Sequence, residues 1–111
     1  DYYEQEIKYQ QVIDKQNNLF ALSKNIEFKV NKNEVTVIFP EELRGRELNG
    51  NLVFYRAVNA DLDFKIPINL NDSLSQTVNF SGREPGYWKV TVDFSDGKLE
   101  YLQEKKLIIG I

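Results

Sequence analysis

The fold of this chain is decided by one stretch, "YWKVTVDFSDGKLEY", at Tyr87–Tyr101. In its first half, Trp88, Val90 and Phe94 alternate with polar residues, which is the period of a half-buried β-strand. The residues "SDG" at Ser95–Gly97 follow as a hairpin turn, because glycine takes positive φ at little cost. The stretch therefore predicts an antiparallel hairpin whose tryptophan face points into a core.

The same alternation, with turn signals between the runs, predicts strands along most of the chain. The run "NLVFYRAV" is apolar on both faces, so we expect a central strand with Phe54 in the core. Pro67 marks its strand as an edge or a break, since proline cannot donate a ladder hydrogen bond. "NKNE" at Asn31–Glu34 is read as a hairpin turn in which asparagine takes positive φ. The predicted strands are Ile26–Val30, Val35–Phe39, Asn51–Val58, Leu62–Leu70, Leu74–Phe80, Tyr87–Phe94 and Lys98–Ile109.

The beginning of the chain differs from the rest, because it is typical of a helix. Residues 1–24 lack glycine and proline and are rich in Glu, Gln and Lys, and Asp1 is placed to cap the first turn. We expect Ile7 and Ile13 to pack on the strands, which leaves Tyr2 and Tyr9 available. The apolar residues that recur at helical spacing are Tyr2, Tyr9, Val12, Ile13, Leu19 and Phe20.

These elements predict a mainly β protein, namely an immunoglobulin-like antiparallel β-sandwich of about seven strands at residues 25–111. The helix at residues 1–24 packs outside the sandwich or against one end. No second helix lies between strands, which excludes parallel βαβ crossovers. A length of 111 residues suits one domain. The predicted core residues are Trp88, Phe54, Val90 and Phe94.

The composition limits which metal sites, catalytic mechanisms and ligands are possible. The chain has no Cys, no His and no Met, so the common zinc, iron and soft copper ligands are missing. Cysteine-thiolate and Ser-His-Asp catalysis are excluded for the same reason. The 14 basic and 17 acidic residues are interspersed, and no basic stripe suggests a nucleic-acid surface. No run approaches the roughly 20 apolar residues of a membrane span.

Paired carboxylates offer a weak case for catalysis or metal binding. Pairs at suitable separation support glycosidase chemistry, but these lie at predicted turns, where Asp and Glu are ordinary solvated residues. We therefore expect a non-enzymatic protein. A structural calcium site is a second weak alternative, since its oxygen ligands would come from two neighbouring loops. The pairs are Glu41/Glu42, Asp61/Asp63 and Asp93/Asp96, and the calcium candidates are Asp61, Asp63, Asp72, Asn59, Asn69 and Asn71.

Arg56 is notable because it follows the apolar run "LVFY". An arginine at the end of a central strand commonly pairs with a nearby carboxylate, and Asp61 or Asp63 is the expected partner. A structural ion pair that holds the loop is the favoured interpretation, and a partner-binding role for Arg56 and Asp61 is the alternative.

Three stretches together resemble the FixH family, also called CcoH. They are "DYYEQEIKYQQVIDKQNN", "GNLVFYRAVNADLDFKI" and "PGYWKVTVDFSDGKLEYLQEKKLII", in the family's order. The helical "YYxxExxYQxxID" pattern is the most specific of them. The resemblance implies a single-pass protein of the bacterial inner membrane, with this domain in the periplasm and Asp1 near the outer face of the bilayer. It implies an accessory role in the assembly or stability of cbb3-type cytochrome c oxidase, exerted by contact with oxidase subunits or assembly factors.

The resemblance also directs attention to contact residues. On the helix we expect Tyr2, Tyr3, Glu6, Tyr9 and Gln10 to meet a partner, together with Arg56 and Asp61 at the end of the sandwich. No cofactor is expected, and without His, Cys or Met the domain is not expected to chaperone copper. The alternative is a generic extracytoplasmic immunoglobulin-like binding module for a glycan or a surface protein.

Overall fold

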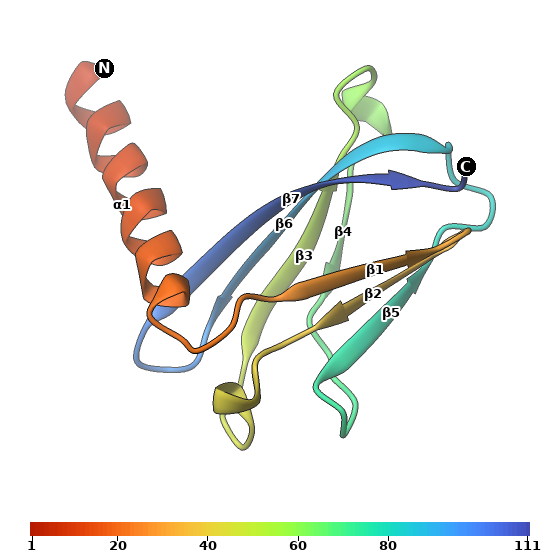
Figure 1. Ribbon diagram of the computed structural model, residues 1–111. Helices are drawn as coiled ribbons and strands as arrows, with labels where there is room; N and C mark the ends of the chain where they lie inside the picture. The colour runs from red at the N-terminus through yellow and green to blue at the C-terminus, as the bar shows by residue number, and fades with distance from the viewer.

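In a computed structural model that describes all residues 1–111, one helix stands beside seven strands (Figure 1). The helix is α1, Tyr2–Phe20. The strands are β1 Glu27–Asn31, β2 Glu34–Ile38, β3 Asn49–Tyr55, β4 Phe64–Pro67, β5 Ser75–Asn79, β6 Gly86–Ser95 and β7 Glu100–Ile109. Two single-turn 3₁₀ helices, η1 at Glu41–Leu43 and η2 at Ala60–Leu62, lie in the connections.

The strands form two antiparallel sheets that face each other, which confirms the predicted sandwich. One sheet has the order β1-β2-β5 and the other β4-β3-β6-β7. β3 is central, as its two apolar faces predicted, and β4 with Pro67 is an edge. In an immunoglobulin constant domain the fourth strand joins the sheet of the first, second and fifth strands. Here β4 pairs with β3 instead.

The predicted core residues are all buried. Trp88 and Phe94 are almost fully enclosed, and Phe54 and Val90 have no exposed surface. Phe54 stacks on Phe64 with ring centroids 4.7 Å apart, and Trp88 meets Phe64 edge-on at 5.6 Å. Such aromatic pairs contribute about 0.5–1.5 kcal/mol each beyond their buried area. The tryptophan also meets Phe80, which directly follows β5 of the other sheet, at 5.5 Å, so it packs on phenylalanine rings rather than on a disulfide.

One side of the sandwich is closed by a side chain. β1 and β7 are edge strands that face each other, and Gln103 joins them. The amide of Gln103 accepts from Ile26 N at 2.9 Å and donates to Ile26 O at 2.9 Å. Lys105 pairs in register with the buried Val90 but remains exposed. A charged side chain on the inward row of an edge strand discourages pairing with another sheet.

Two local expectations were wrong. α1 ends at Phe20 rather than near residue 24, and the backbone N–H of Ser23 then donates to Glu42 Oε1 at 2.6 Å. In the "NKNE" turn the positive φ falls on Lys32, at 53°, and not on an asparagine. The turn is set by the β1–β2 register, which pairs Asn31 with Glu34 and leaves Lys32 at the bend.

Candidate partner-binding site

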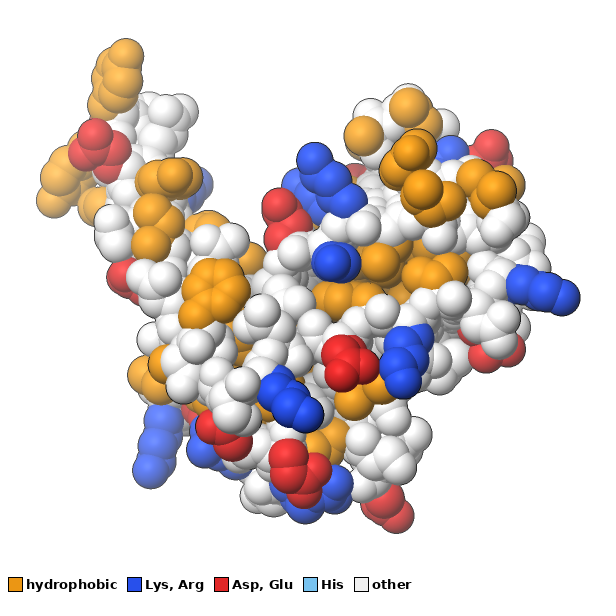
Figure 2. All heavy atoms as spheres, in the orientation of Figure 1, with side chains coloured by type: hydrophobic (Ala, Val, Ile, Leu, Met, Phe, Trp, Pro, Cys, Tyr) orange, Lys and Arg blue, Asp and Glu red, His pale blue; other side chains and the backbone are white.

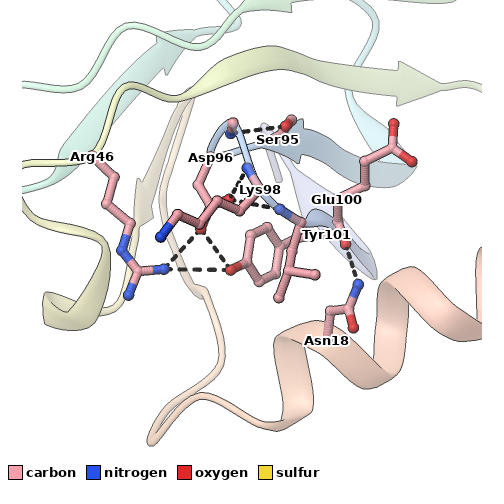
Figure 3. Close-up of polar contacts among 9 residues, drawn as sticks. Asn18, Arg46, Ser95, Asp96, Lys98, Glu100 and Tyr101 are labelled. Carbon is pink, nitrogen blue, oxygen red and sulfur yellow. Dashed lines mark hydrogen bonds and ion pairs between the residues drawn. The ribbon is translucent and has the colours of Figure 1, made fainter.

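α1 is attached to the sandwich only near its C-terminal end. Leu19 is 0% exposed and belongs to the core. Lys15 Nζ lies 3.2 Å from Asp93 Oδ1. Figure 3 shows the second contact, in which Asn18 Nδ2 donates to Glu100 O at 2.8 Å. Apolar packing around Leu19, one ion pair and one hydrogen bond thus hold the helix on β6 and β7.

Beneath this attachment lies a buried carboxylate (Figure 3). The Asp96 side chain is only 4% exposed and accepts from Arg46 Nη1 and Tyr101 Oη, each at 2.8 Å. It also accepts from the backbone N–H groups of Lys98 and Leu99, each at 2.9 Å. These bonds, the one from Leu99 above all, hold the pKa of Asp96 far below its usual range. The network ties the β6–β7 hairpin to the β2–β3 connection.

Tyr101 is the other titratable member of this network. Burial, followed by the hydrogen bond to Asp96, raises the pKa of the Tyr101 phenol. Its ring stacks on Phe94 with centroids 5.0 Å apart, so the network borders the core directly. Sequence reasoning missed it, because an Asp in an "SDG" turn is ordinary and its partner Arg46 is remote in the sequence.

The remainder of α1 extends away from the sandwich (Figure 1). Tyr2 is 90% exposed and Tyr9 is 70% exposed. Tyr3, Glu6 and Gln10 are exposed as well. Figure 2 shows a hollow between this end of the helix and the sandwich. The structure therefore brings all five helical candidates together on one free surface, which we call the free half of α1 and define as residues 1–12.

The expected packing face of the helix was largely wrong. Ile7 is 43% exposed and does not pack on the strands, and Ile13 is only partly buried. Of the apolar residues at helical spacing, Leu19 alone is buried. The helix leaves the sandwich at a diverging angle, so its first turns have nothing to pack against. α1 is also too polar to serve as a membrane-spanning helix.

Arg56 has a different role from the one expected. Its guanidinium donates to Tyr87 O and Pro85 O, each at 2.9 Å, and lies 5.4 Å from the centre of the Trp88 ring. No carboxylate pairs with it, and Asp63 accepts from the Arg56 backbone N–H instead, at 2.7 Å. The expected ion pair was wrong because Arg56 follows the inward-facing Phe54 by two residues and so points beneath the β5–β6 loop.

Gly86, the first residue of β6, allows the Arg56 guanidinium to lie close to the backbone. A Cβ at Gly86 would lie 2.9 Å from Arg56 Nη1, and its φ of +125° is itself unfavourable for other residues. Asp61 lies apart, exposed on η2, where its N–H donates to Asn59 Oδ1 at 3.0 Å. Arg56 and Asp61 thus stand at the β3–β4 end of the sandwich, separate from the free half of α1 (Figure 1).

The two members of each predicted carboxylate pair make separate structural contacts. Glu41 bonds Arg44 and Glu42 bonds Ser23, which lowers the pKa of each carboxyl. Asp93 faces α1, whereas Asp96 lies in the network described above. No three acidic side chains come close enough to hold a metal ion.

Comparison with known proteins gives one match. The family model described as FixH matches residues 1–107, which include α1 and nearly all of the sandwich. No curated protein and no solved structure shows significant similarity.

Proposed function

The chain belongs to the FixH family, and from this premise we propose that it is an accessory protein in the assembly or stability of cbb3-type cytochrome c oxidase. It acts by protein–protein contact and not by catalysis. The observation that carries the proposal is the extent of the family match, which spans the projecting helix as well as the sandwich. In this role the chain is the periplasmic part of a single-pass protein of the bacterial inner membrane.

The contact surface in this proposal is the free half of α1. Tyrosine supplies a large, partly apolar contact area and is enriched at protein interfaces. Tyr2, Glu6 and Tyr9 follow one another at spacings of four and three, as anchors of a helix in a groove do. The attachment at Leu19 holds these side chains away from the sandwich, where an oxidase subunit or another assembly factor can reach them.

Arg56 has a structural part in this role, because it fixes the backbone at one end of the sandwich. Its guanidinium donates to the carbonyl groups of Pro85, in the β5–β6 loop, and Tyr87, near the start of β6, and its Nε is buried without a hydrogen-bond partner. Asp61 remains exposed on η2 and is the candidate contact at this end of the sandwich.

Copper delivery is not part of the proposal. Without His, Cys or Met, the domain has no soft ligand for Cu(I). We expect anaerobic titration of the purified chain with Cu(I) to show no tight stoichiometric binding, and a tight one-to-one isotherm would contradict this.

The decisive experiment is co-purification of the full-length protein with the oxidase from membranes. The Tyr2→Ala/Tyr9→Ala variant should recover at least about tenfold less oxidase, since loss of a hot-spot tyrosine costs about 2 kcal/mol and about 1.4 kcal/mol already lowers affinity tenfold. Phe20→Ala is the matched control, because Phe20 is another exposed aromatic of α1 but lies at its attached end. Equal recovery by all three proteins would refute the contact role.

A deletion strain tests the wider proposal. Loss of the protein should lower the amount or the activity of assembled oxidase, and the wild-type gene should restore it. A strain with normal levels of active oxidase would overturn the accessory role itself.

A further inference from the structure

The outer face of the β4-β3-β6-β7 sheet carries a row of aromatic and basic side chains. Tyr55 pairs with Lys89, and Lys89 pairs with Lys106, so the row crosses three strands. These residues point outward, because their neighbours Phe54 and Trp88 point into the core. We call this surface the lysine–tyrosine face, and its members are Tyr55, Lys65, Tyr87, Lys89 and Lys106.

The chain's own helix covers only the other end of this sheet face. Leu102 points outward, opposite to the core residue Tyr101, yet it is only 8% exposed because α1 packs on this part of β7. Farther along β7, Ile108 is 48% exposed. A shallow groove runs between Tyr55, Tyr87, Lys89 and Lys106.

The lysine–tyrosine face and the free half of α1 are complementary in charge. The face has three lysines against one neighbouring carboxylate, in a protein of net charge −3. The free half of α1 has three carboxylates against one lysine. Both surfaces also present exposed tyrosines. The residues are Lys65, Lys89, Lys106 and Glu104 on the face, and Asp1, Glu4, Glu6 and Lys8 on the helix.

The two surfaces also match in length. The free half of α1 extends about 15 Å from Tyr2 to Val12 at 1.5 Å per residue. Glu104 to Ile108 extends about 13 Å along β7. The helix cannot reach the face of its own molecule, because Leu19 and Asn18 fix its other end in a diverging direction (Figure 1).

We propose that the free half of α1 docks on the lysine–tyrosine face of a second copy of the chain. The contact is reciprocal, so one two-fold dimer contains it twice and buries both free helix ends. Glu6 lies on the same side of the helix as Tyr2 and Tyr9, so it faces Lys89 and Lys106 while the tyrosines cover the groove. Self-association and oxidase binding then compete for Tyr2 and Tyr9, so the dimer is a state in which the proposed contact surface is covered.

The evidence for this dimer lies within the chain itself and does not depend on the oxidase. Its test uses the purified 111-residue chain in sedimentation experiments over a range of concentration and salt. We expect a dimer whose dissociation constant rises with salt, since ionic contacts at a surface are screened. Lys89→Glu/Lys106→Glu should raise that constant more than about tenfold, and Glu6→Lys, on the docked side of the helix, should raise it as well.

Mixing the two charge-reversed variants is the most specific test of the contact. Each alone places like charges together, but in the mixture both helix–face pairs regain opposite charges, so a heterodimer should form. Lys24→Glu/Lys29→Glu is the matched control, because it makes the same change of charge away from the face and should dimerise like the wild type. Circular dichroism confirms that each variant is folded.

Three results would overturn the proposal. The first is a wild-type chain that stays monomeric up to about 1 mM, where a contact of only about 4 kcal/mol would already be visible. The second is a dimer that the charge reversals at Lys89 and Lys106 leave unchanged. The third is a mixture of the two variants that remains monomeric. None of these results bears on the accessory role, which the deletion strain tests.

Discussion

The attached end of α1 and its free half belong to one continuous helix, yet the sandwich holds only one of them. The free half carries three of the chain's six tyrosines, together with Ile7. The attached end has a single fully buried apolar residue, Leu19. The more aromatic part of the helix is therefore the part that leaves the protein surface.

The difference shows that a residue of α1 packs on the sandwich because of where it lies along the helix, and not because of its hydrophobicity. Lys15 and Asn18 lie where the sandwich offers a carboxylate and a backbone carbonyl. Leu19 lies where the gap between the two sheets admits an apolar side chain. One helical turn with specific partners fixes the direction of the whole helix, and the remaining turns stay available for another molecule.

The largest effect should come from removing the apolar attachment. Leu19→Ala should lower the free energy of unfolding by about 2–5 kcal/mol, because it leaves a cavity at a fully enclosed site. Ile7→Ala, on the exposed surface of the same helix, should change it by less than about 0.5 kcal/mol. Urea denaturation followed by Trp88 fluorescence measures both. Equal losses would mean that the free half is packed in solution.

The network beneath the attachment should give the next largest effect. Asp96→Asn removes the charge that Arg46 and Tyr101 bond, and it should cost about 1–3 kcal/mol. Asp61→Asn is the control, because Asp61 is an exposed turn residue. If the two variants unfold at the same urea concentration, the buried carboxylate has no special role in stability.

The same carboxylate predicts a dependence on pH. The pKa of Asp96 is lower in the folded chain than in the unfolded one, so the unfolded state binds the proton first as pH falls. The stabilisation is fully present above about pH 4, the ordinary pKa of aspartate, and decreases as pH falls below it. The wild-type free energy of unfolding should thus fall more steeply from about pH 4 to about pH 2 than that of Asp96→Asn. Parallel curves would contradict this.

The sequence was sufficient for the sandwich because alternation is a local property. Trp88, Val90 and Phe94 are two or four residues apart, so their common face follows from strand geometry alone. The existence of α1 followed in the same way from composition and spacing. Its direction did not, because periodicity shows which residues share a face but not whether another element lies opposite that face.

The candidate site was predictable only in part for a related reason. The exposure of Tyr2 and Tyr9 agrees with the expectation, whereas Arg56 does not pair with a carboxylate. Its partners are the backbone carbonyl groups of Pro85 and Tyr87, and a sequence pattern does not show which carbonyl groups a distant side chain will reach. The ion pair between Arg46 and Asp96 could not be predicted from the sequence either. It depends on how the β2–β3 connection and the β6–β7 turn meet in the folded chain.

The smallest effect on overall stability should come from breaking the free half itself. A proline in a helix interior costs about 3 kcal/mol locally, and a helix of about two turns without tertiary contacts cannot offset that. Ile7→Pro should therefore unfold the first turns of α1, with a measurable loss of helical circular dichroism. The urea midpoint of the sandwich should barely move, because nothing in residues 1–12 is buried. Gln16→Pro is the control, since it interrupts the helix between Lys15 and Leu19 and should lower the midpoint as well. If Ile7→Pro lowers the midpoint as much as Gln16→Pro does, the two parts of α1 are not energetically distinct, and the free half is packed on its own sandwich.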